Sequence, residues 1–106
     1  GKVGTNPEQL FAMGYAACFD SAMNHVAPTL NLKPTKSSTS VGVGIGQKPG
    51  GAFGLDLDIT ITVEGLSLEE AKTLINKAHE VCPYSNAIRG NVDVRLHVNV
   101  IQSFDL

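Results

Sequence analysis

Apolar residues recur with a helical period in two segments of the chain. The first begins at Asn6-Pro7-Glu8, where Asn6 can cap a helix, Pro7 fits its first position and Glu8 suits the positive end of the helix dipole. Its middle, residues 10–19, is apolar on every side, and the run ends at Pro28. We therefore expect a long central helix that is buried on all its faces.

The second helical segment opens with a capping box made of Ser67 and Glu70. Its apolar positions lie on one stripe that runs from Leu68 to Cys82. This spacing predicts an amphipathic helix with Cys82 on the face that meets the core.

Three further segments alternate apolar and polar residues, which is the pattern of a strand with one buried face. They cover residues 38–46, 53–64 and 92–100. Residues 47–51, Gln-Lys-Pro-Gly-Gly, are typical of a turn and would join the first two strands as a hairpin. We predict one α+β domain, residues 1–106, with an antiparallel sheet packed on two helices.

The predicted central helix has a consequence for assembly. A helix that is covered on every side needs more surrounding structure than 106 residues supply. We therefore expect a homodimer, additional sequence, or both. The chain starts with Gly1 rather than methionine, so we also expect a processed or truncated N-terminus.

Composition favours a folded globular chain, because 42% of the residues are hydrophobic and 17% are charged. The net charge is −2 and no cationic block occurs, so nucleic acid and anionic membranes are not expected partners. The uncharged stretch between Glu8 and Asp20 is too short to cross a bilayer. No secretory signal is visible, and we expect a cytoplasmic protein.

The two cysteines, Cys18 and Cys82, are the main candidates for chemistry. In the cytosol, paired cysteines are more often catalytic or redox-sensing than structural. Cys82 ends a helix, where the dipole disfavours a thiolate, so it suits the role of a resolving thiol. Cys18 lies in an apolar shell that raises its pKa, so it needs a nearby cation to become a nucleophile. We expect Arg89 to be the only cation near the pair, because Arg95 lies on the outward face of its strand.

Glu8 could hold a catalytic guanidinium through a bidentate contact. It lies ten residues before Cys18, about 15 Å along the helix, so the two meet only if Glu8 comes from a twofold-related chain. Phe11, Tyr15 and Phe19 are candidates for the lining of an apolar substrate pocket, although such residues are usually part of the core.

No metal centre and no bound cofactor are expected. His25 and His79 lack the short spacing of metal ligands, so we expect a polar group at a helix end and a surface histidine. Asp56 and Asp58 lie two residues apart on one strand face, which favours a solvated surface over a catalytic pair.

Two stretches of the chain resemble the organic hydroperoxide resistance proteins of the OsmC-like superfamily. They are residues 4–19, which begin Gly-Thr-Asn-Pro-Glu-Gln, and residues 81–91, which begin Val-Cys-Pro-Tyr-Ser-Asn. The resemblance implies a bacterial thiol peroxidase that reduces alkyl or fatty-acid hydroperoxides to alcohols and forms an intertwined homodimer. The family's catalytic arginine and N-terminal strands precede the Gly-Thr-Asn-Pro motif, so we expect this chain to lack them.

By the same resemblance, Cys18 would be the peroxidatic cysteine, and Cys82 would convert its sulfenic acid to a disulfide. A lipoyl dithiol, carried by a lipoylated protein, would be the external reductant. Glu8 matches the glutamate that holds the family's catalytic arginine. Three other interpretations stay open: a non-enzymatic redox-sensing or binding module, an inactive fragment that dimerises, and a structural domain that is cross-linked by a disulfide.

Overall fold

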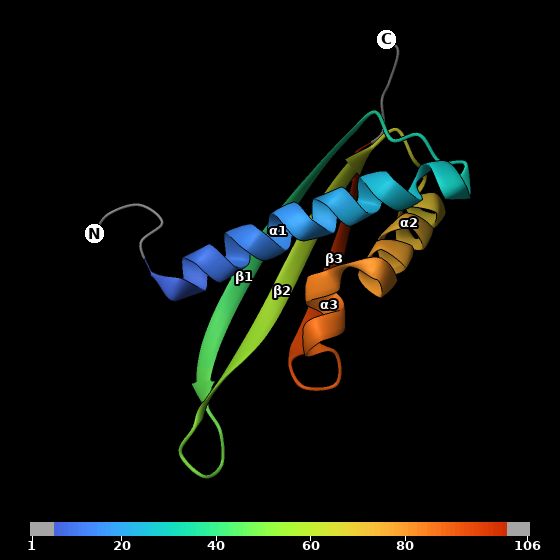
Figure 1. Cartoon of the computed structure of the whole chain (residues 1–106). Coiled ribbons are helices and arrows are strands. Elements are labelled where there is room, and N and C mark those ends of the chain that lie inside the picture. Colours follow the sequence, from blue (N-terminus) through green and yellow to red (C-terminus); the bar gives the residue numbers. More distant parts are fainter. Residues whose placement is uncertain (1–5, 102–106) are drawn as a thin grey trace.

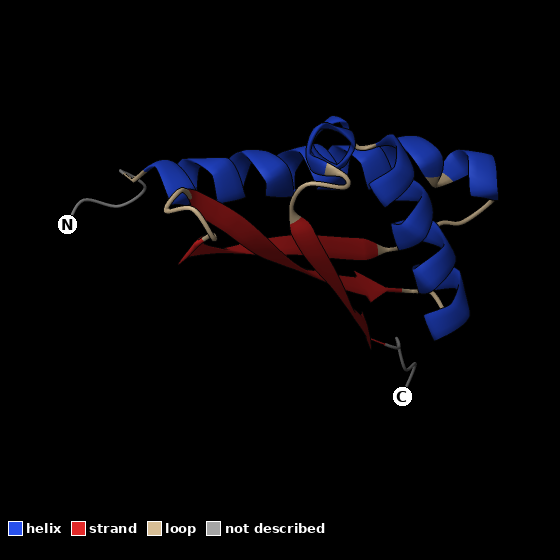
Figure 2. Cartoon of the chain, turned by 90° about the horizontal axis from the view of Figure 1, so that it is seen from below, coloured by secondary structure: helices blue, strands red, loops and turns tan. Residues whose placement is uncertain are grey.

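The computed structural model describes residues 6–101. In chain order the elements are α1 (Pro7–Val26), the 3₁₀ helix η1 (Pro28–Leu30), β1 (Lys36–Gln47), β2 (Phe53–Glu64), α2 (Leu68–Val81), α3 (Pro83–Ile88) and β3 (Asp93–Ile101). The helices lie on one face of a three-stranded sheet, so the chain has the predicted α+β architecture in two layers (Figures 1 and 2). On that face, α1 packs against β1 and α2 packs against β3.

Both long helices begin where the sequence predicts. The Asn6 side chain accepts a hydrogen bond from the Gln9 backbone N–H, with an N–O distance of 2.7 Å. At the start of α2, Ser67 Oγ accepts from the Glu70 backbone N–H at 3.1 Å, and Glu70 Oε1 accepts from the Ser67 N–H at 3.0 Å. These contacts satisfy backbone N–H groups that have no partner within the helix.

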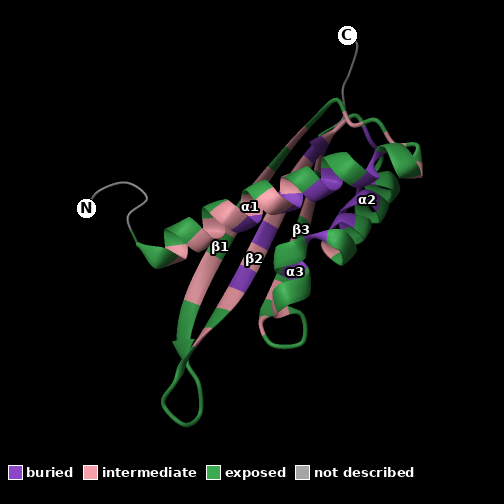
Figure 3. Cartoon of the chain, viewed as in Figure 1, coloured by how far each residue is buried: buried purple, intermediate pink, exposed green. Residues whose placement is uncertain are grey.

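Burial of α1 is one-sided. Tyr15, Phe19 and Met23 face the sheet and the other helices and are buried. On the remaining surface, Leu10 is 57% exposed and Met13 is 61% exposed. Figure 3 shows exposed and intermediate segments along this side of α1. The prediction of burial on every face is therefore wrong for the single chain, because the sheet and α2 cover only one side of the helix.

A short third helix, α3, directly follows α2 and was missed by the prediction of two helices. Cys82 has an extended backbone (φ −64°, ψ 124°) and serves as the last cap of α2 and the first cap of α3. Pro83 ends α2 because it has no backbone N–H, yet it fits the first position of a new helix. The chain therefore bends sharply at Cys82, and we call residues 82–85 the elbow.

The three strands match their predicted segments to within two residues at each end. β1 and β2 form the predicted antiparallel hairpin, in which Val41 lies opposite Ile59. β2 and β3 are parallel, with Ile59 opposite Leu96, so the prediction of a wholly antiparallel sheet is wrong. The reason is that α2 and α3 form a crossover, which returns the chain to the end of the sheet where β2 began.

β2 is the central strand, and its inward-facing side chains form the middle of the core. These side chains are fully buried: Leu57, Ile59, Ile61 and Val63. On the opposite face Asp58 pairs with Arg95 (Nε–Oδ1 2.8 Å) and with His97 (Nε2–Oδ1 2.8 Å). These two partners hold the pKa of Asp58 well below its usual range. The expected outward orientation of Arg95 is confirmed.

Two kinds of feature are absent from the described part of the chain. No helix within residues 6–101 combines the length and the apolar character needed to cross a membrane. The same residues contain no group of three or more Asp, Glu, His or Cys side chains placed to hold a metal ion.

Candidate active site

The structure brings Cys18 of α1 and Cys82, which lies between α2 and α3, into contact. Figure 1 shows how these three helices come together. Cys18 is half-buried on α1, whereas Cys82 is fully buried at the elbow. Both thiols are free, and Cys82 donates a hydrogen bond to the Cys18 sulfur with an Sγ–Sγ distance of 3.3 Å. A disulfide has an S–S distance of about 2 Å, so a small movement would join the two. Cys18 is the more accessible sulfur and is the better placed to meet a reactant.

Burial raises the pKa of the Cys18 thiol above its usual value. A backbone hydrogen bond from Tyr84 acts in the opposite direction, while Cys82 raises the pKa further. No lysine, arginine or histidine within residues 6–101 contributes to this shift. This agrees with the expectation that the apolar surroundings of Cys18 raise its pKa, while its need for an added cation stays a prediction.

Arg89 does not supply that cation. Its Nη2 donates a hydrogen bond to the His79 carbonyl oxygen at 2.5 Å, and its Nη1 donates to Asn86 Oδ1 at 2.9 Å. Burial raises the pKa of Tyr15 and lowers the pKa of His79, and the Arg89 guanidinium adds a smaller lowering contribution to both, but it is not among the groups that shift the pKa of Cys18. The Arg89 side chain links the end of α3 to α2, so it holds the local turn and does not act on the Cys18 thiol.

An aromatic cluster borders the thiol pair. The Tyr84 ring stacks on Phe11, with centroids 5.9 Å apart, and lies 5.6 Å from the Tyr15 ring. Gly14 permits this approach, since a Cβ at that position would lie 2.9 Å from the Tyr84 hydroxyl oxygen. Phe11 and Tyr84 keep exposed surface, so an apolar and partly accessible patch lies beside Cys18.

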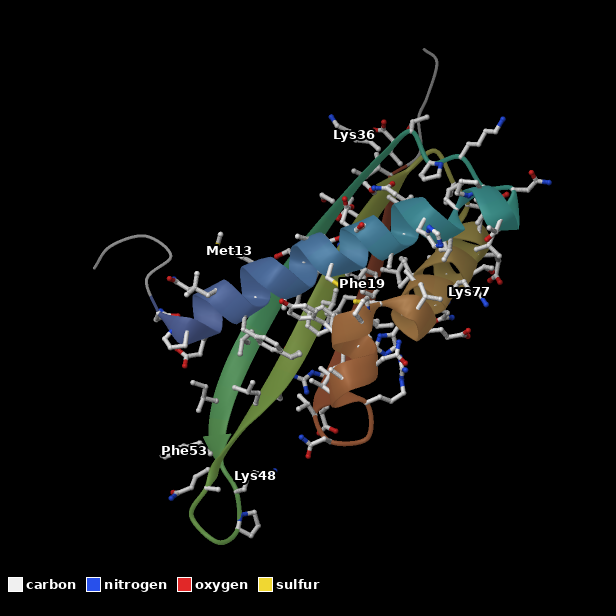
Figure 4. The ribbon with its side chains drawn as sticks, viewed as in Figure 1. Met13, Phe19, Lys36, Lys48, Phe53 and Lys77 are labelled. Atoms are coloured by element: carbon white, nitrogen blue, oxygen red, sulfur yellow. The ribbon has the colours of Figure 1, made fainter. Side chains whose placement is uncertain are left out.

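Tyr15 and Phe19 have no exposed surface in the single chain. Phe19 lies on the side of α1 that faces α2 and α3, and its ring centroid is 6.4 Å from that of His79 (Figure 4). Both side chains therefore belong to the core. Of the three residues predicted to line a substrate pocket, only Phe11 has surface that a reactant could touch in this chain.

Glu8 lies in the first turn of α1, where it borders a shallow hollow together with Val43 and Ile45 of β1. It is separated from Cys18 by ten residues of continuous helix, about 15 Å along the axis. Within one chain the structure does not bring Glu8 to the thiol pair. Its predicted role in the site stays a prediction.

The sequence analysis missed a buried polar group next to the cysteines. Ser85 is fully buried on α3, and its hydroxyl is hydrogen-bonded to Tyr15 and to His79. His79, which forms one of these hydrogen bonds, is half-buried. The prediction that it is a surface histidine is therefore wrong. A usable signal was present, because proline favours the first position of a helix, and a helix that begins at Pro83 places Ser85 in its first turn.

The fold and the thiol pair together define a class: an α+β protein with two free cysteines in direct contact, suited to dithiol redox chemistry. Residues 1–97 match the family model described as OsmC-like protein. The chain belongs to the OsmC-like family, in its organic hydroperoxide resistance branch.

Relatives in sequence and in structure carry consistent names. The chain is 58% identical to the organic hydroperoxide resistance protein of Xanthomonas axonopodis pv. citri, over 91% of this chain and 68% of that protein. It is 44% identical to OhrB of Bacillus subtilis, over 92% of this chain and 72% of that protein. The crystal structure of an organic hydroperoxide resistance protein from Elizabethkingia anophelis superposes with a TM-score of 0.87 at 49% identity, covering 92% of this chain and 69% of that chain. The chain thus spans about two-thirds of the length of these relatives.

Proposed function

We propose that the chain acts as a thiol peroxidase that reduces organic hydroperoxides to alcohols in the bacterial cytoplasm, with Cys18 as nucleophile and Cys82 as resolving thiol. The observation that carries the proposal is the contact between the two sulfur atoms, 3.3 Å apart and unequally buried. The names of the relatives, which are organic hydroperoxide resistance proteins, support the same substrate class.

The proposed reaction has two steps at the thiols. The Cys18 thiolate attacks one peroxide oxygen, the O–O bond breaks, and the departing alkoxide takes a proton to become the alcohol, leaving a sulfenic acid on Cys18. The Cys82 thiol then attacks the Cys18 sulfur, the S–O bond breaks, and water leaves with the Cys82 proton as the disulfide forms. A lipoyl dithiol on a lipoylated protein reduces the disulfide and is itself oxidised to its cyclic disulfide.

The first step requires a cation, since burial favours the neutral thiol of Cys18. Residues 6–101 contribute none to its pKa, and the family resemblance implies an arginine in this role. A carboxylate such as Glu8 can hold a guanidinium bidentately. Because Glu8 is remote from Cys18 on the same helix, we propose that a homodimer supplies it from the second copy. The uncovered surface of α1 supports such an assembly.

The partly exposed rings of Phe11 and Tyr84 support an apolar substrate. An alkyl or fatty-acid chain would lie on these rings while its peroxide group reaches Cys18. A charged or strongly polar peroxide would gain nothing from this surface, because its burial there would not be offset by hydrogen bonds.

A second candidate function is a non-enzymatic redox sensor or binding module, in which the two thiols cycle to a disulfide without turning over peroxide. The raised pKa of Cys18 favours it, because a protonated thiol is a slow nucleophile toward peroxides. In this case the disulfide forms by exchange with other disulfides, and hydroperoxide is not consumed.

The test measures loss of an alkyl hydroperoxide in the presence of dihydrolipoamide, for the chain and for Cys18→Ser and Cys82→Ser. We expect slow turnover by the chain that increases with pH, none by Cys18→Ser, and one turnover by Cys82→Ser with a Cys18 sulfenic acid that dimedone traps. Ser21→Ala, a change at an exposed position of α1, is the matched control and should behave as the unmodified chain. Equal rates for the chain and Cys18→Ser would contradict the assignment of Cys18.

A further inference from the structure

A second contact joins the two segments that carry the cysteines. The Tyr15 hydroxyl and Ser85 Oγ are hydrogen-bonded at 2.5 Å, and both residues are fully buried. Tyr15 precedes Cys18 by three residues on α1, and Ser85 follows Cys82 by three residues at the elbow. Residues three apart on a helix share a face, so α1 and the elbow meet through two adjacent contacts, one between sulfurs and one between hydroxyls.

His79 extends this contact to the third helix. Its Nδ1 lies 2.8 Å from Ser85 Oγ, so the Ser85 hydroxyl is hydrogen-bonded to α1 and to α2 at once. Because Ser85 itself belongs to α3, one buried hydroxyl connects all three helices around the thiols. A buried hydroxyl that loses its partners keeps the cost of its desolvation, so this arrangement resists separation of the helices.

A hydrogen bond between α1 and the elbow is needed to fix the position of Cys82 relative to Cys18. Cys82 is at the point where the backbone turns between two helices, and α3 has no side-chain hydrogen bond at its N-cap. The Asn86 side chain donates to the Cys82 carbonyl oxygen at 3.0 Å, but this contact lies within the elbow region and does not reach α1. Within residues 6–101, Cys18 accepts a hydrogen bond from the Tyr84 backbone N–H and one from Cys82, and the Tyr15–Ser85 bond is the side-chain hydrogen bond between α1 and the elbow that involves neither sulfur.

We propose that Ser85 is a positioning residue for the dithiol: through its hydrogen bond to Tyr15 it holds the Cys82 sulfur within reach of Cys18. Holding two reacting groups together raises their effective concentration toward each other and favours the bond that joins them. Ser85 thereby stabilises the Cys18–Cys82 disulfide relative to the two thiols. It touches neither peroxide nor sulfur in this role.

The relevant equilibrium needs no peroxide. Oxidised glutathione accepts attack by one cysteine thiolate, which releases one glutathione thiol and forms a mixed disulfide. The second cysteine then attacks the protein sulfur of the mixed disulfide, which releases a second glutathione thiol as the Cys18–Cys82 bond forms. Two protein thiols are oxidised and one glutathione disulfide is reduced, so the equilibrium constant reports the effective concentration of the two cysteines.

The experiment measures this constant in glutathione redox buffers by mass spectrometry after acid quenching and alkylation. Ser85→Ala and Tyr15→Phe each remove one hydroxyl of the pair, and we expect both to lower the constant about tenfold, which is about 30 mV in the reduction potential. The double variant should lower it little further, since both changes break the same bond. The matched control is Thr39→Val, which removes a buried hydroxyl of β1 that has no hydrogen-bond partner within residues 6–101. It should leave the constant unchanged.

A purely structural role for Ser85 predicts a different outcome. It would destabilise the reduced and oxidised forms equally, which lowers the thermal unfolding temperature but leaves the potential at its original value. Unchanged constants in Ser85→Ala and Tyr15→Phe would therefore overturn the proposal. If Ser85→Ala does not fold, Tyr15→Phe decides alone, because it retains the buried ring. The proposal does not rest on peroxidase activity, and a chain inactive toward hydroperoxides would still give the expected shift.

Discussion

Cys18 and Cys82 differ in what surrounds their sulfur atoms, and this difference follows from their positions in the helices. Cys18 lies on the side of a continuous helix and keeps some accessible surface, whereas Cys82 lies inside the elbow and has none. The raised pKa of Cys18 could be predicted from its apolar neighbours alone. The particular partners of Arg89 could not be predicted, because they depend on where the guanidinium finds carbonyl and amide oxygens in the folded chain.

His79 is expected to make stability depend on pH. Burial, with a smaller contribution from the Arg89 guanidinium, lowers its pKa below the usual value of 6.5. In the unfolded chain His79 takes up a proton near that value, while in the folded chain it does so only at lower pH. Between these two pKa values the unfolded chain binds more protons than the folded chain. The contribution of neutral His79 to the free energy of unfolding is therefore complete above the usual pKa and is lost as the pH falls through the pKa of the folded chain.

The measurement is urea unfolding on both sides of the usual histidine pKa, for the unmodified chain and for His79→Gln. The loss of stability at acidic pH should be smaller in His79→Gln, because glutamine does not titrate there. His25→Gln removes an exposed histidine instead and is the matched control. An identical loss in the unmodified chain and in His79→Gln would refute the prediction.

At the scale of elements, the starts of the helices were the most predictable features. Asn6, Ser67 and Glu70 act locally, since each binds backbone N–H groups within three residues along the chain. The short helix α3 was missed because its apolar pattern is too brief to detect. The direction of β3 was missed for another reason: alternation defines the faces of a strand but carries no information on its neighbour's direction.

The capping box of α2 gives a prediction at this scale. Ser67→Ala removes the side-chain acceptor of the Glu70 N–H and should lower the free energy of unfolding by about 1 kcal/mol. Urea unfolding measures the change, and the slope with denaturant should stay constant because the core is unaffected. Ser40→Ala, at an exposed position of β1, should cost less than about 0.5 kcal/mol. Equal losses of unfolding free energy in Ser67→Ala and Ser40→Ala would show that the capping box does not stabilise the protein.

At the scale of the whole molecule, the notable feature is a long helix that one chain covers on one side only. Leu10 and Met13 lie on the uncovered surface, although the sequence pattern is that of a helix with no solvent-facing side. Exposed apolar residues of this kind commonly mark an interaction surface. This conflict between pattern and burial is the physical basis for the proposed homodimer.

We expect the chain to sediment as a dimer at micromolar concentration, and Met13→Lys to shift it to a monomer, because a buried lysine without a partner is costly. Asn76→Lys adds the same charge at an exposed position of α2, outside the proposed dimer surface, and should leave the dimer intact. A chain that sediments as a monomer at all concentrations, or an equal effect of both lysines, would exclude α1 as the dimer surface.

The sequence by itself determined the helix starts, the strand faces, the hairpin and the two cysteines, because these depend on side-chain type and on contacts between near neighbours. Only the tertiary structure decided that Cys18 and Cys82, 64 residues apart, lie in contact, and that Ser85 connects Tyr15 with His79 around them. Such contacts join distant segments through the packing of three helices on a sheet. No local pattern along the chain encodes which of the possible packings has the lowest free energy.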